Sequence, residues 1–242
     1  MHLEKIYEGK AKIIFASSDP NCVIQHFKDD ISAFNKQKFD TIYGKGIINN
    51  HISTALMQKL EIAGISTHFV KILNEREQLV KKVEMVPLEV VVRNFTAGSF
   101  CKRFNTSEGT QFLLPIIEFF YKDDSVSDPI VNEDHILYFK WLTKEEINEI
   151  KSLALCVNSY LADLFFTIGI KFVDLKLEFG KLMAGDKSNK ILLADEISPD
   201  NCRLWDIQTG RKLDKDCYRL ELGEVIEIYE EVAKRLGIIF HK

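Results

Sequence analysis

Residues 173–180 read VDLKLEFG, a stretch in which charged and apolar side chains alternate without a break. The two sets are Asp174, Lys176 and Glu178 on one side and Leu175, Leu177 and Phe179 on the other. Successive side chains of a β-strand point to opposite faces, so the pattern predicts a strand with one buried face and one charged face. That charged face is either an ordinary solvated surface or a site that handles charge.

A second apolar run, KILLADE (190–196), follows the polar segment AGDKSN (184–189), and the two runs together predict a β-hairpin. In that hairpin Asp195 can face Glu178, and two neighbouring carboxylates repel each other unless a cation or a proton joins them. Mg²⁺ suits this position because it takes one or two protein carboxylates and completes its coordination with phosphates and water. A structural carboxylate–lysine network through Lys176 is the alternative.

The first 95 residues are rich in short apolar runs that predict strands. The runs are 3–9, 11–17, 22–27, 68–74, 78–84 and 88–95. Helices are predicted at 46–64, at 143–169 and at about 218–236, from apolar stripes at helical spacing. Helices segregated from largely antiparallel strands predict an α+β fold. We divide the chain at MVP (85–87) into a β-rich lobe, 1–86, and a larger α+β lobe, 87–242.

The composition is that of an ordinary globular protein, with 46% hydrophobic and 28% charged residues among 242. A net charge of −4 and a pI of about 5.9 give no basic surface for nucleic acid or an anionic membrane. The segment MHLEKIYEGK is unlike a signal peptide, and no apolar run approaches the ~20 residues that span a bilayer. Cysteines 22, 101, 156, 202 and 217 form no metal or redox pattern, which predicts free thiols and a cytoplasmic location.

Several common catalytic motifs are missing from the sequence. It contains no G-x-x-x-x-G-K-[ST], G-x-G-x-x-G, H-E-x-x-H or G-x-S-x-G, and its six histidines show no metal spacing. These absences argue against P-loop, Rossmann, zincin and α/β-hydrolase enzymes.

The segment YEGKAK (7–12) places a glycine and two lysines in a tight turn between two predicted strands. Gly9 allows the backbone to approach a ligand, and Lys10 and Lys12 share a side if the strand continues. Two ammonium groups there can hold phosphate oxygens. A solvated hairpin edge, where lysines discourage aggregation, is the alternative.

The segment LEVVVRNFTAGS (88–99) places Arg93, one of seven arginines, after three valines in a strand that should be largely buried. A buried guanidinium needs an anion, because an unpaired buried charge is costly. Glu89 lies on the same strand face, and AGS can open a helix whose first N–H groups and Ser99 hydroxyl suit a phosphate. An internal Arg–Glu pair with a purely structural role is the alternative.

Together these segments contain the charged groups needed to bind an Mg-nucleotide and a second anionic substrate. The groups are two N-terminal lysines, a carboxylate pair with an intervening lysine, and two arginines, Arg93 and Arg203. Phosphoryl transfer depends on cationic clamps and a metal ion far more than on a nucleophilic side chain.

Eight motifs occur in an order that is typical of one family. They are YEGKAK, DDISAF, GKG, MVPLEVVVRNFTAGS, DPIVNE, VDLKLEFG, ADEISPDNCRLWD and LDKDCYR, and they span essentially the whole chain. The sequence closely resembles the phosphoribosylaminoimidazole-succinocarboxamide synthases, or SAICAR synthetases, of de novo purine biosynthesis. Cys202 departs from the small polar residue expected in its motif, but it is not one of the catalytic groups that the resemblance implies.

The resemblance implies an ATP-dependent ligase. It would join L-aspartate to the carboxylate of 5-amino-1-(5-phosphoribosyl)imidazole-4-carboxylate, a carboxyaminoimidazole ribonucleotide, through an acyl phosphate. The products would be SAICAR, ADP and phosphate. The resemblance also implies two lobes with ATP between them, distantly similar to protein kinases, and an oligomer, most simply a dimer.

Site residues follow from the resemblance, position by position. For ATP they are Lys10 and Lys12 at the phosphates, Ala11 between them, Met85 at adenine and Lys81 nearby. For Mg²⁺ they are Glu178 and Asp195, and Lys176 balances charge at the transferring group. For the ribonucleotide they are Glu89 at the ribose and Arg93 and Ser99 at the phosphate, with Arg203 at an anionic substrate group. The DDISAF (29–34) and GKG (44–46) loops are the expected L-aspartate pocket.

Two other functions fit the same residues. A small-molecule kinase on a related fold would explain the lysines and carboxylates equally well, and it would turn over with a single acceptor. A non-catalytic nucleotide-binding regulatory module would bind ATP without forming ADP in response to a substrate.

Overall fold

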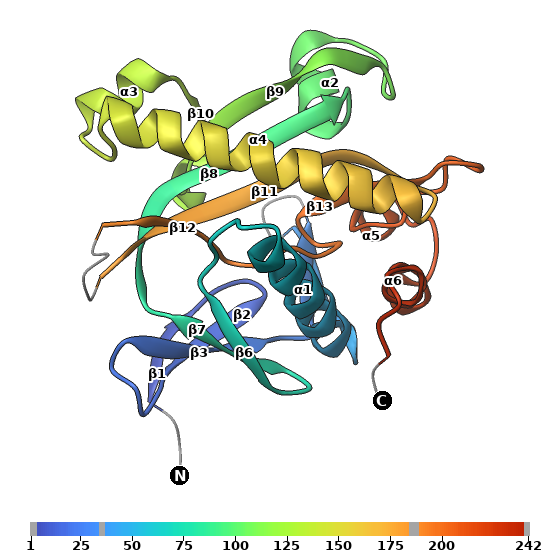
Figure 1. Ribbon diagram of the computed structural model, residues 1–242. Coiled ribbons are helices and arrows are strands. Elements are labelled where there is room, and N and C mark those ends of the chain that lie inside the picture. Colours follow the sequence, from blue (N-terminus) through green and yellow to red (C-terminus); the bar gives the residue numbers. More distant parts are fainter. Residues whose placement is uncertain (1–3, 34–36, 184–188, 240–242) are drawn as a thin grey trace.

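The computed structural model describes residues 4–33, 37–183 and 189–239, and two antiparallel sheets form its framework (Figure 1). The five-stranded sheet has the order β1 (Lys5–Glu8), β2 (Lys12–Ala16), β3 (Cys22–Phe27), β7 (Glu77–Lys81) and β6 (Phe69–Asn74). The six-stranded sheet has the order β10 (Ile130–Val131), β9 (Gln111–Tyr121), β8 (Val83–Phe95), β11 (Ile170–Leu182) and β12 (Ile191–Ala194), with β13 (Cys202–Asp206) also paired to β11. A small hairpin consists of β4 (Asp30–Ala33) and β5 (Lys38–Thr41). The predicted α+β class is confirmed.

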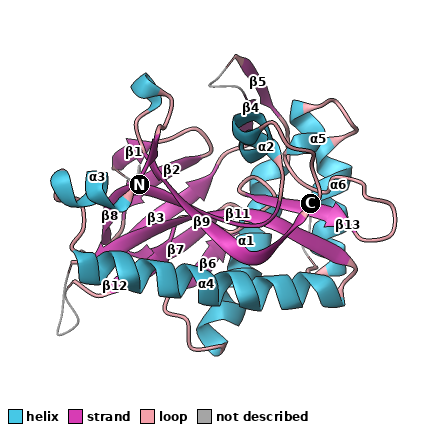
Figure 2. Cartoon of the chain, turned by 90° about the horizontal axis from the view of Figure 1, so that it is seen from above, coloured by secondary structure: helices cyan, strands magenta, loops and turns pink. Residues whose placement is uncertain are grey.

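The helices cover the two sheets from different sides. They are α1 (Lys45–Ile62), α2 (Gly98–Phe104), α3 (Glu133–Tyr138), α4 (Lys144–Thr167), α5 (Asp216–Arg219) and α6 (Val225–Arg235), with a 3₁₀ turn η1 (Asp124–Val126). The long α4 runs along β11, as Figure 2 shows from above, whereas α1 packs against α6 and the five-stranded sheet. Among the described residues, no helix is both long and apolar enough to span a membrane.

Strand β11 is the central strand of the larger sheet, and it contains VDLKLEFG. It pairs with β8, β12 and β13, and Glu178 lies opposite Ala194 in the β12 ladder. Leu175, Leu177 and Phe179 have no exposed surface, so the inward face of the predicted strand is confirmed. The predicted hairpin with residues 190–196 is also confirmed, although residues 184–188 of its turn lie outside the described part of the chain.

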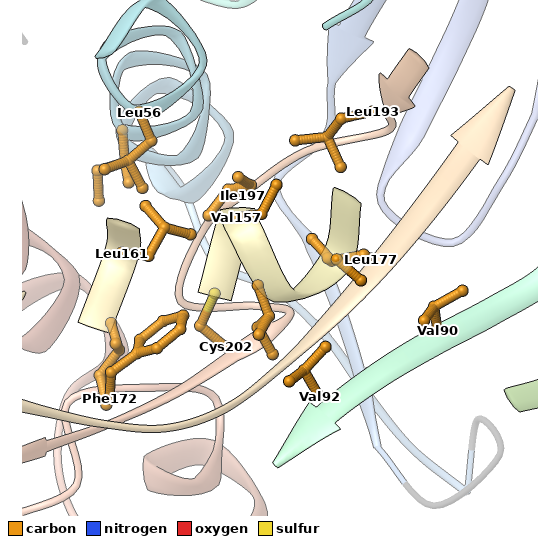
Figure 3. Close-up of a cluster of buried hydrophobic side chains, with 14 of the residues drawn as sticks. Leu56, Val90, Val92, Val157, Leu161, Phe172, Leu177, Leu193, Ile197 and Cys202 are labelled. Carbon is orange, nitrogen blue, oxygen red and sulfur yellow. The ribbon is translucent and has the colours of Figure 1, made fainter. Parts of the chain in front are cut away.

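One hydrophobic core extends from α1 to the larger sheet (Figure 3). Figure 3 labels Leu56 of α1, Val90 and Val92 of β8, Leu161 of α4 and Leu177 of β11 among its members. Full burial of such a side chain stabilises the fold by roughly 1.5–3 kcal/mol. The apolar face of β11 therefore packs into this core and fixes the position of the charged face on its other side.

Two of the three predicted helices are confirmed and the third is wrong. The predicted helix at 46–64 is α1, and Thr143 and Glu146 form the expected capping box of α4. The predicted helix at 218–236 is instead two helices, because α5 ends at Arg219 and α6 begins at Val225. Glu221 (φ 56°) and Gly223 (φ 149°) lie between them, and neither backbone conformation fits an α-helix.

The change from one sheet to the other occurs between the end of β7 at Lys81 and the start of β8 at Val83. The predicted lobe boundary at 86/87 falls inside β8, where a register irregularity between Glu178 and Gly180 lies opposite the segment around Pro87. Such an irregularity accommodates proline, which has no N–H to donate to a ladder. The division into lobes 1–86 and 87–242 stays a prediction.

Candidate active site

A cleft of about 1200 Å³ opens between the two sheets. Strands β2, β3 and β7 line one side, and β8 and β11 line the other. All twelve residues named from the sequence as site residues contribute to its wall. They are Lys10, Ala11, Lys12, Lys81, Met85, Glu89, Arg93, Ser99, Lys176, Glu178, Asp195 and Arg203.

The charged face of β11 points into this cleft. Lys176 donates hydrogen bonds of 2.9 Å to Glu178 on its own strand and to Glu89 on β8. Burial disfavours the ammonium of Lys176, but the carboxylates of Glu178 and Glu89 outweigh that effect and raise its pKa well above the usual range. Lys176 is therefore a fixed positive charge on the cleft wall.

Glu178 and Asp195, the two predicted metal ligands, both lie in the cleft. Asp195 directly follows β12 and has a left-handed backbone (φ 62°), a conformation that aspartate tolerates better than most residues. Glu178 accepts from Lys122, and Asp195 accepts from Lys12. Burial alone would raise the pKa of each carboxyl, but these neighbouring ammonium groups lower both pKa values below their usual range.

The donor set fits Mg²⁺. The charge of Asp195 opposes ionisation of Glu178, so the two carboxylates lie close enough to sense each other. No group of three or more potential metal ligands occurs among the described residues, and Mg²⁺ does not need one, since phosphate oxygens and water supply its other ligands. Lysines hold both carboxylates ionised, which is the form that binds a cation.

The two lysines of YEGKAK reach different partners. Lys12 opens β2, and its ammonium contacts Asp195 and, at 2.9 Å, Glu196. Lys10 precedes the strand and pairs with Asp124 of η1 at 2.6 Å. The two lysines were expected to share a side only if the strand continued through both, and that condition is not met, because β2 begins at Lys12. Both still line the cleft.

Arg93 is only 2% exposed and is paired inside the protein. It donates to Glu118 of β9 at 2.7 Å, to Asp174 of β11 at 2.8 Å and to the Ser99 hydroxyl at 3.1 Å. The buried Arg–Glu pair considered from the sequence therefore exists, but its acid is Glu118. Glu89 instead accepts a hydrogen bond from Lys176.

Asp174 joins the two arginines of the predicted site. Its carboxylate accepts from Arg93 and Arg203, both at 2.8 Å, and the residue is only 4% exposed. Gly98 (φ 53°) lies directly against the Arg203 guanidinium, where a Cβ would collide with it. A glycine at this point lets the start of α2, with Ser99, approach both arginines.

Met85 and Lys81 line the cleft near the point where β7 passes into β8. Met85 is 40% exposed, and Lys81 donates to the backbone carbonyl of Thr67 at 2.9 Å. His68 also lines the cleft, with an exposed fraction of 3%, and burial lowers its pKa to about 4. Its neutral imidazole therefore adds no charge to the cleft.

The two loops expected to hold L-aspartate lie in different environments. Ser32 and Ala33 of DDISAF line the cleft, whereas residues 34–36 lie outside the described part of the chain. Lys45 of GKG is 1% exposed and pairs with Asp200 at 2.6 Å. Asp200 lines the cleft and Lys45 does not, so the lysine of this loop is buried beneath the cleft surface.

Several residues of the site were missed from the sequence. Lys122 follows the apolar strand β9, and its position just after that strand was the available signal. Glu118 is an acid inside the same apolar strand, a pattern that indicates a buried ion pair. Lys215 and Arg219, which also line the cleft, belong to the LDKDCYR motif. Their spacing in the sequence did not indicate what they bind.

Comparison with known proteins gives a consistent result over the whole chain. The SAICAR synthetase family profile matches residues 5–236. A phosphoribosylaminoimidazole-succinocarboxamide synthase from Wolbachia pipientis subsp. Culex pipiens is 63% identical over 239 residues, covering 98% of this chain and 99% of the relative. The corresponding enzyme from Ehrlichia chaffeensis is 61% identical over 236 residues, covering 98% and 97%.

Solved structures agree with the sequence relatives. A crystal structure of the Ehrlichia chaffeensis synthase superposes with a TM-score of 0.95 at 60% identity, covering 98% of this chain and all of the other. A SAICAR synthetase in complex with ADP superposes with a TM-score of 0.92 at 43% identity, covering 98% and 99%.

Proposed function

The chain belongs to the SAICAR synthetase family, and from this premise we propose how its cleft performs the reaction. The enzyme is an ATP-dependent ligase of purine biosynthesis that joins L-aspartate to the carboxylate of the carboxyaminoimidazole ribonucleotide. The observation that carries the site assignment is the position of Glu178 and Asp195, two ionised carboxylates held by lysines in one cleft.

ATP occupies the side of the cleft formed by the five-stranded sheet. Lys10, Ala11 and Lys12 surround its phosphates, and the backbone near Met85 contacts adenine beside Lys81. An ADP complex of a 43% identical SAICAR synthetase supports nucleotide binding by this fold. Lys12 then exchanges part of its contact with Asp195 for phosphate oxygens, which keeps its charge compensated.

Glu178 and Asp195 hold Mg²⁺, which would neutralise charge on the phosphates of ATP when it is bound. The lysines around these carboxylates keep them deprotonated, and Lys176 stays close to the group being transferred. A positive charge fixed before the reaction is an efficient way to stabilise the spread negative charge of phosphoryl transfer.

The ribonucleotide occupies the side formed by β8, β11 and α2. Glu89 accepts hydrogen bonds from ribose hydroxyls, and Arg93 and Ser99 hold the phosphate with Arg203 beside them. Support comes from the hydrogen bonds that already converge on Asp174 and Ser99, which orient both guanidinium groups before a ligand arrives. Such preorganisation lowers the entropy that binding costs.

Activation of the carboxylate explains the need for ATP. A carboxylate is a poor electrophile, because attack by an amine would have to expel oxide. Transfer of the γ-phosphoryl group to the carboxylate oxygen forms an acyl phosphate and releases ADP. The amine of L-aspartate then attacks the carbonyl carbon, the C–O bond to phosphate breaks, and the proton lost by the nitrogen leaves with solvent or phosphate.

An isotope experiment tests this order of bonds. With ¹⁸O in the ribonucleotide carboxylate, one labelled oxygen should appear in inorganic phosphate for each SAICAR formed. Phosphate without label would rule out the acyl phosphate, whereas the ligase activity itself would still be recorded as SAICAR.

We also propose that the enzyme is cytoplasmic and forms an oligomer, most simply a dimer. Dependence on ATP and five cysteines outside disulfides support the location. Exposed apolar side chains of α2 and β9, namely Phe104, Leu113 and Leu114, support self-association. Sedimentation analysis at assay concentration measures the oligomeric state, and a monomer under those conditions contradicts the proposal.

A further inference from the structure

Arg103, in the last turn of α2, is bound to two polar side chains although it is not part of the cleft wall. Its guanidinium contacts the carboxylate of Glu118 on β9 and donates to the Ser99 hydroxyl at 3.2 Å. It also lies over the ring of Phe120 on β9, 5.7 Å from the ring centroid. The Arg103 side chain is only 28% exposed, so these contacts fix it between α2 and β9.

Glu118 connects Arg103 to Arg93. One of its carboxylate oxygens contacts Arg103, and the other accepts from Arg93 at 2.7 Å. Glu118 is 8% exposed, so water competes little for its oxygens. Charge-assisted hydrogen bonds between guanidinium and carboxylate groups are strong and have a defined geometry. The two arginines are therefore held in fixed positions relative to each other.

The Ser99 hydroxyl accepts a hydrogen bond from each of these arginines, at 3.1 Å from Arg93 and at 3.2 Å from Arg103. A hydroxyl has two acceptor lone pairs and one proton to donate, whereas a guanidinium can only donate. Both lone pairs of Ser99 are thus used by the arginines. Within the described residues the hydroxyl donates to no protein acceptor, and Ser99 lines the cleft. Its proton is therefore available to an acceptor that enters the cleft.

The same contacts continue into a longer chain of alternating charges. The chain extends from α2 to α5 in the order Arg103, Glu118, Arg93, Asp174, Arg203, Asp216 and Arg219. Arginine keeps its proton in proteins, so guanidinium groups stand at both ends of the chain and outnumber its carboxylates. With the carboxylates ionised, the chain has an excess of positive charge, which favours an anionic ligand beside it.

We propose that Arg103 is a positioning residue for the ribonucleotide and that it acts through Ser99. Together with Arg93 it fixes the Ser99 hydroxyl as a hydrogen-bond donor, and this donor meets a phosphate oxygen of the ribonucleotide. The proposal rests on the phosphate site described above and adds to it a residue that does not touch the ligand. Without Arg103, one lone pair of Ser99 loses its partner, the hydroxyl can rotate, and the preorganisation of the site decreases.

Steady-state kinetics of Arg103→Gln tests the proposal. The KM for the ribonucleotide should rise ~5–10-fold, because a hydrogen bond to a charged group loses its fixed direction. The phosphate does not take part in the reaction, so kcat and the KM for ATP should stay within about twofold of wild type. Lys102→Gln removes the same charge from the neighbouring exposed position of α2 and, as the matched control, should change none of these values. An unchanged ribonucleotide KM in Arg103→Gln overturns the proposal, as does an equal rise in the KM for ATP.

The variant Ser99→Ala, alone and combined with Arg103→Gln, shows whether Arg103 acts through Ser99. Ser99→Ala alone should raise the ribonucleotide KM at least as much as Arg103→Gln does, since it removes the donor itself. In the alanine background, Arg103→Gln should raise this KM by less than about a further twofold. An equal rise in both backgrounds would mean that Arg103 binds the phosphate directly or only anchors α2, and it overturns the proposal. An unchanged KM in Ser99→Ala overturns it as well.

Arg103→Lys gives a second test that does not need the glutamine variant to fold. Lysine keeps the positive charge beside Glu118 but lacks the planar fork that serves Glu118 and Ser99 together. The ribonucleotide KM should therefore still rise, by ~3-fold or more. A wild-type KM in this variant contradicts the proposal, because charge alone would then be sufficient. Failure of the ligase function itself would appear separately, as absence of SAICAR from the wild-type reaction.

Discussion

At the scale of single residues, the cleft is built from cations and anions that already neutralise each other. Lys12 contacts Asp195, Lys122 contacts Glu178, and Arg93 contacts Glu118. The sequence identified most of the charged groups, because a charge in an apolar strand is informative by itself. It did not identify the partner of each charge, since a partner such as Asp195 lies 183 residues from Lys12 in the chain and meets it only after folding.

Loss of either carboxylate that we propose as a metal ligand should slow the reaction. We expect Glu178→Gln or Asp195→Asn to lower kcat by roughly 10²-fold or more, because both changes remove a charge that places the metal without changing side-chain size. Asparagine also tolerates the left-handed backbone at 195. Steady-state rates at ordinary Mg²⁺ measure the effect, and Glu227→Gln, at an exposed position of α6, is the control. Near-normal turnover in either variant would remove that residue from the metal site.

Replacement of Arg93 should weaken ribonucleotide binding in particular. Lysine at this position keeps one charge but cannot serve Glu118, Asp174 and Ser99 together, because it lacks the planar fork of guanidinium. We expect Arg93→Lys to raise the KM for the ribonucleotide ~10-fold or more, with a much smaller change for ATP. Arg211→Lys, at a half-exposed surface pair, is the control. An unchanged ribonucleotide KM argues against a phosphate site at Arg93.

At the scale of elements, alternation and helical spacing predicted β11, β12, α1 and α4 well. The predicted C-terminal helix was wrong because its apolar spacing continues across Glu221 and Gly223, where the backbone leaves the helix. Leu222, an apolar residue between these two positions, is 53% exposed. Periodicity alone cannot detect such a break, although Gly223 indicated one, because glycine is unfavourable inside a helix. The cleft residues of this segment, Lys215 and Arg219, lie at α5 and not on α6.

The capping box of α4 should contribute to stability without affecting chemistry. Thr143 accepts from the Glu146 N–H at 3.2 Å, and Glu146 accepts in return from the Thr143 N–H at 2.8 Å. We expect Thr143→Ala to lower the free energy of unfolding by about 1 kcal/mol, with kcat and all KM values unchanged. Urea denaturation measures the loss, and Thr143→Ser should restore most of it. Equal stability of the alanine variant contradicts the cap.

At the scale of the whole molecule, the cleft exists because two sheets meet where β7 passes into β8. Sequence patterns predicted the strands on both sides, but long-range pairings such as β8 with β11 decide which strands face each other. Local patterns contain no information on those pairings. The family resemblance predicted a cleft and its residues, and the structure added the ion pairs and the contacts of Asp174 with both arginines.

A buried acid makes the global stability depend on pH. Asp214 has no exposed surface, and burial, with the nearby charge of Asp216, raises its pKa to about 7. The folded state therefore holds a proton that the unfolded state releases near pH 4, so this contribution to stability is complete below pH 4 and lost as the pH rises to 7. We expect the difference in unfolding free energy between wild type and Asp214→Asn to decrease by roughly 1 kcal/mol per pH unit between pH 5 and pH 7.

Urea titrations at several pH values measure this difference. Asp163→Asn, at an exposed position of α4, is the control and should leave the pH dependence of wild type unchanged. A constant difference between wild type and Asp214→Asn over this range would mean that Asp214 ionises at its ordinary pKa.

The central claim is that one cleft couples ATP cleavage to the joining of two other substrates. Its most direct test is a coupled assay of ADP release in which each substrate is omitted in turn. We predict sustained ADP formation only when ATP, the ribonucleotide and L-aspartate are all present, with one SAICAR formed per ADP. Sustained ADP formation with the ribonucleotide alone, leaving phosphate on it, would identify a kinase and contradict the account. ADP formation that ignores both substrates would contradict it as well.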